Sequence, residues 1–175
     1  MSRMVSWLSH RERQLFYMVN RRARNAVLDK AFSAITHMGG ATFTIALSLL
    51  IGLAGIGKWS LAGWECLIAL AVSHIPVAVV KRTYPRRRPY LVLPETNIGK
   101  NPLSDHSFPS GHSTAIFAVA VPLVAAAPAI GFFLLPLAGL VSVSRIYLGL
   151  HYPSDCAAGI VIGSTVGLAT VAILG

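Results

Sequence analysis

The chain has 175 residues, of which 54% are hydrophobic and only 12% are charged. Its mean hydropathy of +0.64 excludes an ordinary soluble domain and predicts an integral membrane protein with one helical domain. The net charge of +9 would suggest a nucleic-acid partner in a soluble protein. Beside membrane spans, basic residues set topology or contact anionic lipids, so the expected partner is the lipid bilayer and not nucleic acid.

The first 30 residues alternate apolar and basic positions, which predicts an amphipathic helix lying in the membrane interface. The apolar positions near helical spacing are Val5, Leu8, Leu15 and Val19, and the opposed basic positions are Arg11, Arg13, Arg21, Arg22 and Arg24. We therefore expect an interfacial segment over residues 1–30 and a transmembrane domain over residues 31–175.

Five apolar stretches follow, and at about 1.5 Å per residue each approaches or exceeds the length that a membrane crossing needs. They are residues 36–57, 61–81, 111–127, 130–148 and 154–174. The polar connection over residues 81–110 is interrupted by five prolines and is expected to be a loop. The sequence thus predicts an all-α integral membrane fold, with about five transmembrane helices plus the interfacial helix.

Five spans place the loop at 81–110 and the connection near 145–154 on the same side of the membrane, because two spans lie between them. The unusual polar residues gather in these two places. They form three clusters: Lys81 with Arg88; Ser110, Gly111 and His112; and Arg145, His151 and Asp155.

The cations of these clusters indicate an anionic ligand, since an arginine fork matches two phosphate oxygens and a lysine supplies a point charge. Lys81, Arg88 and Arg145 are the candidates, because charges close to the membrane are costly and tend to be functional. The neighbouring arginines are interpreted instead as topology or snorkelling residues; they are Arg82, Arg86 and Arg87.

The cluster at residues 110–112 lies at the predicted start of the third span. Free N–H groups and the positive end of the helix dipole make such a start an anion site, and Gly111 leaves room for close backbone approach. The alternative is a Ser110 helix cap with a neutral His112 at the interface.

His151 and Asp155 are four residues apart, with Pro153 in the first turn of the last span. Asp155 can then accept a hydrogen bond from one imidazole nitrogen and leave the other free to attack or to carry a proton. The alternative is a purely structural pair. No metal site is expected, because Asp155 is the sole carboxylate near the two histidines. The other histidines are expected to be solvated or bonded to backbone; they are His10, His37, His74 and His106.

The three clusters spell K-x6-R-P, P-S-G-H and S-R-x5-H-x3-D between Lys81 and Asp155. This signature resembles that of the type 2 phosphatidic acid phosphatase superfamily, whose helical core and phosphate site are shared with vanadium haloperoxidases. The resemblance implies a metal-independent, cofactor-free lipid phosphatase. Many members have six spans, so five spans behind an amphipathic segment would be a departure.

The resemblance also implies a role for each matched residue. His151 would be the nucleophile that forms a phosphohistidine, Asp155 would orient it, and His112 would be the general acid. The remaining matched residues would cradle the phosphate; they are Lys81, Arg88, Ser110, Gly111 and Arg145.

The first candidate substrate is undecaprenyl diphosphate, with phosphatidylglycerol phosphate and phosphatidate as alternatives. A candidate of another class is a non-catalytic protein that binds or transports lipid phosphates, but pure binding needs no acid and nucleophile. Haloperoxidase chemistry with vanadate in the phosphate site is a third hypothesis, disfavoured by burial in a membrane. No oligomeric state is predicted.

Two arguments about sidedness disagree. The resemblance to bacterial members implies a bacterial cell membrane with the active site facing outward. Of the 15 Lys and Arg, however, Lys58 alone lies on the side opposite the predicted site, and a basic side of this kind is typically cytoplasmic.

Overall fold

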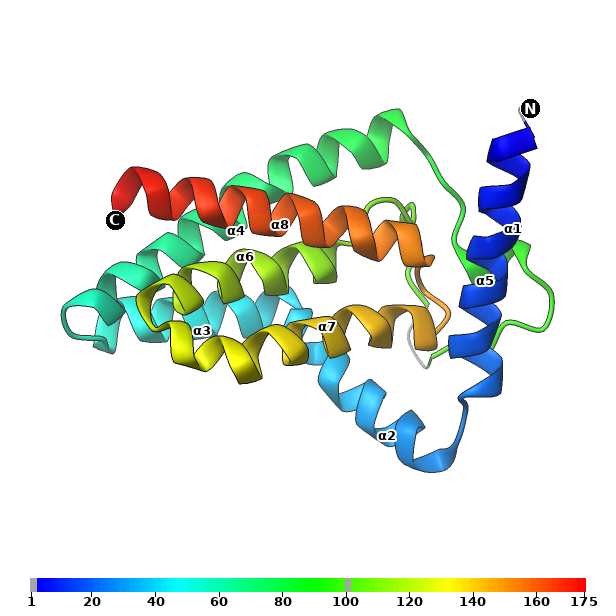
Figure 1. The fold of residues 1–175 in the computed structure, drawn as a ribbon, viewed down its shortest axis with the longest axis horizontal. Coiled ribbons are helices and arrows are strands. Elements are labelled where there is room, and N and C mark those ends of the chain that lie inside the picture. Colours follow the sequence, from blue (N-terminus) through cyan, green and yellow to red (C-terminus); the bar gives the residue numbers. More distant parts are fainter. Residues whose placement is uncertain (1–2, 100–101) are drawn as a thin grey trace.

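The computed structural model describes residues 3–99 and 102–175, and the regular elements in these ranges are all helices. The bundle is built from α3 (Ala41–Ala54), α4 (Lys58–Thr83), α6 (Gly111–Ala126), α7 (Gly131–Tyr147) and α8 (Pro153–Leu174). These helices run in the long direction of the molecule, and α6 contacts the other four (Figure 1). The predicted all-α fold is confirmed.

Helices occur at all five predicted span positions, but they are not equally long. Three are long and apolar enough to cross a membrane alone: α4, α8, and α7 together with the preceding turn. At the first predicted span, two apolar helical segments, Ala26–Gly39 and Ala41–Ala54, meet at an angle of 55°, the geometry of a broken span or of a re-entrant loop. The third, α6, has only 16 residues. Because α6 is enclosed by its neighbours, with most of its residues buried, it need not match the bilayer thickness.

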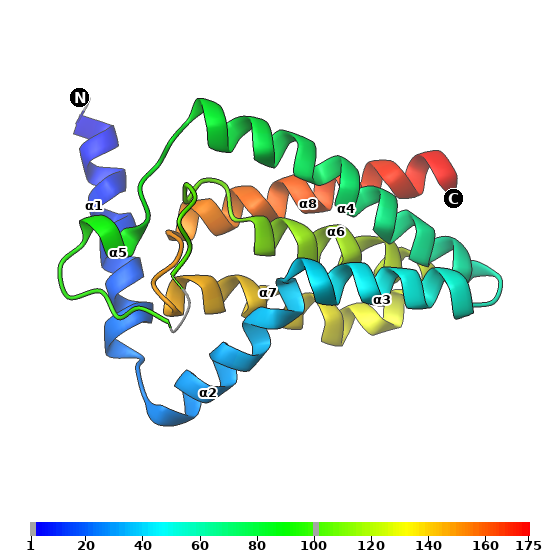
Figure 2. The same ribbon diagram turned by 180° about the vertical axis from the view of Figure 1, so that it is seen from behind.

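The N-terminal segment is two helices rather than the single one expected over residues 1–30. Helix α1 (Arg3–Tyr17) continues into a π-helical turn, η1 (Met18–Arg22), and α2 (Ala26–Ile35) follows after a short connection. Asn25 causes the restart, because its side-chain oxygen accepts hydrogen bonds from the N–H groups of Val27 and Leu28 at 3.1 and 2.9 Å. Figures 1 and 2 show α1 lying across one end of the bundle, the end at which α8 begins.

The face of α1 that holds it to the bundle differs from the predicted apolar stripe. Glu12, Phe16 and Asn20 are spaced four residues apart and share one helix face. Phe16 is fully buried, and Asn20 donates to the carbonyl oxygens of Asn97 and Tyr147, both at 2.8 Å. Val5, Leu8 and Leu15 of the predicted stripe are exposed, as the lipid-facing surface of an interfacial helix would be.

Glycines allow the helices to approach closely at two places. A Cβ atom at Gly163 of α8 would lie 2.3 Å from the carbonyl oxygen of Thr114 in α6. A Cβ atom at Gly63 of α4 would lie 2.1 Å from the backbone nitrogen of Gly52 in α3. From this contact near their connecting loop, α3 and α4 diverge toward the end where α1 lies (Figure 2). Small residues at such crossings are the usual means of helix packing in lipid.

Candidate active site

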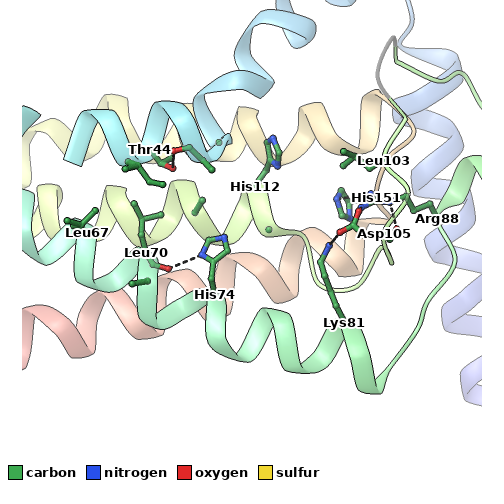
Figure 3. Close-up of a pocket in the computed structure, with 16 residues that line it drawn as sticks. Thr44, Leu67, Leu70, His74, Lys81, Arg88, Leu103, Asp105, His112 and His151 are labelled. Carbon is green, nitrogen blue, oxygen red and sulfur yellow. Dashed lines mark hydrogen bonds and ion pairs between the residues drawn. The ribbon is translucent and has the colours of Figure 1, made fainter. Parts of the chain in front are cut away.

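A cavity of about 610 Å³ lies between α3, α4 and α6, on the side where α3 and α4 diverge. At one end it is lined by five of the eight predicted site residues: Lys81, Arg88, Gly111, His112 and His151. Elsewhere its wall is largely apolar and includes Ile45, Leu67, Leu70 and Ala115. Figure 3 shows Lys81, Arg88 and Asp105 beside His151, with His112 further along the cavity.

The two cations of the first cluster converge on one carboxylate, that of Asp105. Lys81 forms an ion pair with Oδ2 of Asp105, and Nη2 of Arg88 lies 2.6 Å from Oδ1. Burial acts to raise the pKa of Asp105, but the hydrogen bonds and charges of Lys81 and Arg88 outweigh it and lower the pKa to about 2. The position between Lys81 and Arg88 therefore holds an anion, here one that the chain itself supplies.

Arg88 also fixes the protonation pattern of His151. It is 1% exposed, its Nη1 donates to the carbonyl oxygen of Leu150 at 2.7 Å, and the same atom lies 3.2 Å from Nε2 of His151. A guanidinium has only donors, so Nε2 acts as the acceptor and the ring proton belongs on Nδ1. Nε2 is thus the basic nitrogen, held beside the cations.

Asp155 stands behind His151. Its Oδ2 accepts from the backbone N–H of Tyr152 at 2.8 Å and lies 3.6 Å from Nδ1 of His151, just beyond hydrogen-bond length. Burial lowers the pKa of His151 to about 4; Arg145 and Arg88 add to this, while Asp155 opposes it. At neutral pH the His151 imidazole is therefore uncharged, as a nucleophile must be.

Ser110 lies behind the cavity wall rather than in it. It is fully buried and caps α6: its hydroxyl accepts from the backbone N–H of Ser113 at 3.4 Å and from the Ser113 hydroxyl at 3.1 Å. Its own N–H donates to the carbonyl oxygen of Asp155 at 3.0 Å. The cap expected as the alternative for Ser110 is thus present, and Gly111 and His112 follow it into the cavity lining.

Arg145 is 3% exposed, and its Nη1 donates to the hydroxyl of Thr36 at 2.7 Å. Within residues 3–99 and 102–175, its Nε and Nη2 atoms have no hydrogen-bond partner. Buried donors are nearly always paired, so this guanidinium has two nitrogens that an oxyanion would satisfy.

Residues 62–175 match the sequence profile of the PAP2 superfamily. The chain belongs to this superfamily. All eight predicted site residues fall inside the matched PAP2 segment. This match confirms the family that the three clusters resemble. With its long apolar helices, the chain is a multi-pass membrane protein.

Two relatives illustrate the similarity. The decaprenylphosphoryl-5-phosphoribose phosphatase of Mycobacterium tuberculosis (strain H37Rv) is 36% identical over 112 residues, which are 63% of this chain and 58% of the relative. The undecaprenyl-diphosphatase of Sulfolobus acidocaldarius is 31% identical over 112 residues, 63% of this chain and 54% of the relative. The aligned part of this chain spans little more than half the length of either protein.

The fold is also similar to that of LpxE from Aquifex aeolicus. Its crystal structure aligns with a TM-score of 0.83 at 26% sequence identity, covering 91% of this chain and 93% of LpxE. The alignment extends beyond the segment that matches the PAP2 profile, so the likeness includes much of the N-terminal part.

Sequence reasoning misjudged one arginine and overlooked one carboxylate in this PAP2 site. Arg86, expected to set topology, instead donates from Nη1 to Oδ1 of Asp155 at 2.6 Å. Arg82 and Arg87 are exposed, as expected. The sequence does not predict a role for Asp105, because this residue belongs to no spaced motif. Its one sequence signal is a negative charge four residues before Pro109, which precedes the cluster of Ser110, Gly111 and His112.

Three of the four other histidines are placed as expected, whereas His37, expected to bond a backbone carbonyl, is exposed; His10 is exposed, as expected. Nδ1 of His74 lies 2.9 Å from the carbonyl oxygen of Leu70, and His106 is exposed. His74 also lines the cavity, on the same face of α4 as Lys81 and about two helical turns before it.

Proposed function

We propose that the chain is a membrane phosphatase that removes the terminal phosphate of a lipid phosphate or diphosphate through a phosphohistidine on His151. One observation carries the proposal: a single cavity joins a cluster of cations and imidazoles to a long apolar wall. That combination suits a ligand with a phosphate at one end and a hydrocarbon chain at the other. The relatives named as lipid phosphatases support the same class of reaction.

In the first step, Nε2 of His151 attacks the terminal phosphorus. A nitrogen–phosphorus bond forms while the bond from phosphorus to the bridging oxygen breaks, and His112 gives its proton to the departing oxygen. Lys81, Arg88 and Arg145 offset the charge on the phosphoryl oxygens, so most of the acceleration comes from electrostatics and positioning. The carboxylate of Asp155 stabilises the positive charge that the His151 ring acquires.

In the second step, water replaces histidine. His112, now unprotonated, takes a proton from a water molecule, whose oxygen attacks phosphorus as the nitrogen–phosphorus bond breaks. Inorganic phosphate leaves, and His151 and His112 return to their starting states. For a diphosphate substrate, the first product is the lipid monophosphate.

We propose a polyprenyl diphosphate, with undecaprenyl diphosphate first, as the substrate. Both relatives described above are named for substrates with polyprenyl chains, and the wall formed by Ile45, Leu67 and Leu70 is of a kind that a branched hydrocarbon can fill. We further propose that the site faces away from the cytoplasm of a bacterial cell, as the family resemblance implies.

The test is phosphate release by the purified protein in detergent with a metal chelator present. The substrates are undecaprenyl diphosphate, phosphatidylglycerol phosphate and phosphatidate. We expect release to be fastest from the diphosphate, to fall about 10²- to 10⁴-fold in His112→Ala, and to disappear in His151→Ala. Full activity in either variant, or dependence on an added metal, would refute the mechanism.

The binding or transport hypothesis predicts a different result. A non-catalytic protein would retain lipid phosphate with equal affinity in the wild type and in His151→Ala, and neither would release phosphate. A radiolabelled terminal phosphate separates the two hypotheses further, because only the phosphatase becomes transiently labelled, and only when His151 is present.

A further inference from the structure

Arg86 makes a set of contacts around Asp155 that the two-histidine mechanism does not use. Its Nη1 donates to Oδ1 of Asp155 at 2.6 Å and to the hydroxyl of Ser154 at 2.7 Å. Its guanidinium carbon lies 3.9 Å from the ring centroid of Tyr152. Burial acts to lower the pKa of Arg86, but Asp155 and Glu12 outweigh it and raise the pKa, so the side chain is a permanent cation.

Arg86 is itself held from the other side by α1. Its Nη2 lies 2.6 Å from Oε2 of Glu12, and the other oxygen of Glu12 accepts from both the hydroxyl and the N–H of Ser154. Glu12 belongs to the helix face that also carries Phe16 and Asn20, so the seating of α1 on the bundle determines where this carboxylate lies. A chain of contacts therefore runs from α1 through Arg86 to Asp155.

Asp155 needs such a partner for two physical reasons. It is fully buried, and a buried carboxylate without a counter-ion is driven toward its neutral form. The N–H of Tyr152 holds Oδ2 alone, so the bond from Arg86 to Oδ1 is what fixes the plane of the carboxylate. Only a charged and oriented Asp155 can stabilise the imidazole of His151 when that ring bears the phosphoryl group.

We propose that Arg86 is a positioning residue for this reaction, holding the Asp155 carboxylate against His151 while Glu12 of α1 holds Arg86. Arg86 does not line the cavity and does not contact the phosphate cradle, so it acts through Asp155. The inference rests on the proposed phosphatase function, and it gives the N-terminal helix a part in catalysis.

The experiment compares kcat and KM for phosphate release in Arg86→Gln, Arg86→Lys and Glu12→Gln with the wild type. We expect Arg86→Gln to lower kcat by about tenfold to a hundredfold, by analogy with the loss of a hydrogen-bond partner behind a metal-ligating histidine. KM and the inhibition constant of orthovanadate should stay within about twofold, because the cations that bind the phosphate are untouched. Arg86→Lys should recover part of kcat, since it keeps a cation near Oδ1.

Glu12→Gln tests the link to α1, and it leaves the core intact. It should lower kcat by about two- to fivefold, the size expected for a partly exposed ion pair. In the double variant Glu12→Gln with Arg86→Gln, kcat should equal that of Arg86→Gln alone, because Glu12 acts through Arg86. Arg87→Gln removes the same charge from an exposed neighbour and should leave kcat unchanged.

Three results would overturn the inference. Wild-type kcat in Arg86→Gln would show that Asp155 needs no such partner. A rise in the orthovanadate inhibition constant of Arg86→Gln as large as the fall in kcat would place Arg86 in the phosphate cradle. Independent, multiplying effects of Glu12→Gln and Arg86→Gln would break the link through Arg86. A wild-type protein that releases phosphate from no lipid would instead overturn the proposed function, and this inference with it.

Discussion

Asp105 occupies the position between Lys81 and Arg88 at which a phosphate would meet the same two cations. Its side chain is 53% exposed, whereas that of Arg88 is 1% exposed, so the carboxylate is the more accessible partner of the pair. The backbone carbonyl of Asp105 also accepts from Nε of Arg88 at 2.8 Å. The main chain of this residue can therefore keep Arg88 in place when the carboxylate gives way to substrate.

Asp105→Asn should tighten the binding of anions. It removes the negative charge that competes for Lys81 and Arg88 and leaves the backbone contact to Arg88 in place. We expect the inhibition constants of orthovanadate and phosphate to fall by about fivefold, the equivalent of one partly exposed ion pair. Inhibition assays at constant ionic strength measure this, with Glu95→Gln as the control, because Glu95 is the other carboxylate of the loop. Weaker inhibition by both anions would show that Asp105 orients the cations rather than competing for them.

The lowered pKa of His151 predicts the acidic limb of the activity profile. A neutral His151 attacks and a protonated one cannot, so kcat/KM should be independent of this group above its pKa of about 4 and fall tenfold per pH unit below it. The same lowered pKa makes the folded state less stable in acid. Between about pH 6.5 and 4 the unfolded chain binds a proton at His151 and the folded chain does not, so the free energy of unfolding falls as the pH falls. The measurement is kcat/KM from pH 3 to 7, with activity restored at pH 7 as the control. An acidic limb near pH 6.5 would contradict the buried, neutral state.

The residues found from the sequence and those missed differ in one physical respect. Lys81, Arg88, His112, His151 and Asp155 are predicted by their residue types together with the spaced signature that they spell, and four of them line one cavity with Asp155 behind it. Arg86 and Asp105 acquire their roles from how the loop folds back over the bundle, and no local spacing encodes that path.

At the scale of helices, the packing of α8 on α6 sets the separation between the two histidines. His112 is in the first turn of α6, and His151 lies two residues before the first residue of α8, Pro153. Besides Gly163, Gly159 of α8 also lies against α6, where a Cβ atom would come within 2.6 Å of the carbonyl oxygen of Ser110. In the proposed mechanism, the distance between the helix axes thus determines whether His112 and His151 can reach one phosphorus atom.

Gly163→Ala should destabilise the protein and slow the reaction. The added methyl group meets backbone atoms of α6, which cannot move aside alone, so the helices must separate at a cost of about 1–3 kcal/mol. Thermal unfolding in detergent and kcat measure the two effects. Gly139→Ala on α7 is the matched control, because a Cβ atom there meets nothing within 4 Å. Equal stability of the two variants would contradict close packing of α6 on α8.

Hydropathy predicts where helices form but not how they bend or which face they bury. All five apolar stretches are helical, yet the first is bent at the Gly39–Gly40 connection and α6 is shorter than a span. For α1 the apolar stripe predicts the exposed, lipid-facing side but not the face that seats the helix on the bundle, because half-buried Glu12 and buried Asn20 are held there by hydrogen bonds rather than by hydrophobicity. Tertiary partners of this kind lie far along the chain and leave no periodic signal.

Across the whole molecule, charge is concentrated at one end. Five of the six acidic residues lie there, and each is paired with a basic side chain; they are Glu12, Asp29, Glu95, Asp105 and Asp155. In the proposed mechanism, Lys81, Arg88 and Arg145 are needed at the site whichever side it faces. Under the proposed function, part of the basic excess at this end belongs to the phosphate site, so it argues less strongly that this end is cytoplasmic.

Labelling of single cysteines tests the outward orientation. Ile98→Cys lies at the charged end and Ile56→Cys at the opposite end; the native side chains are 45% and 88% exposed. The natural thiols of Cys66 and Cys156 are buried, so they give little background. We expect an impermeant maleimide to label Ile98→Cys in intact cells and Ile56→Cys only after lysis. The reverse pattern would place the active site in the cytoplasm.

The divergence of α3 and α4 has a kinetic consequence. The cavity wall is shared by these two helices, which also carry exposed apolar residues such as Leu50, Ile68 and Val72 on their outer surfaces. For the proposed phosphatase we therefore predict that the lipid substrate enters between α3 and α4 from within its own leaflet, without crossing water. The substrate concentration that determines the rate is then the mole fraction of substrate lipid in the membrane, not its concentration in the whole suspension. Diluting the substrate with inert lipid should slow turnover, while diluting the whole suspension with buffer should not.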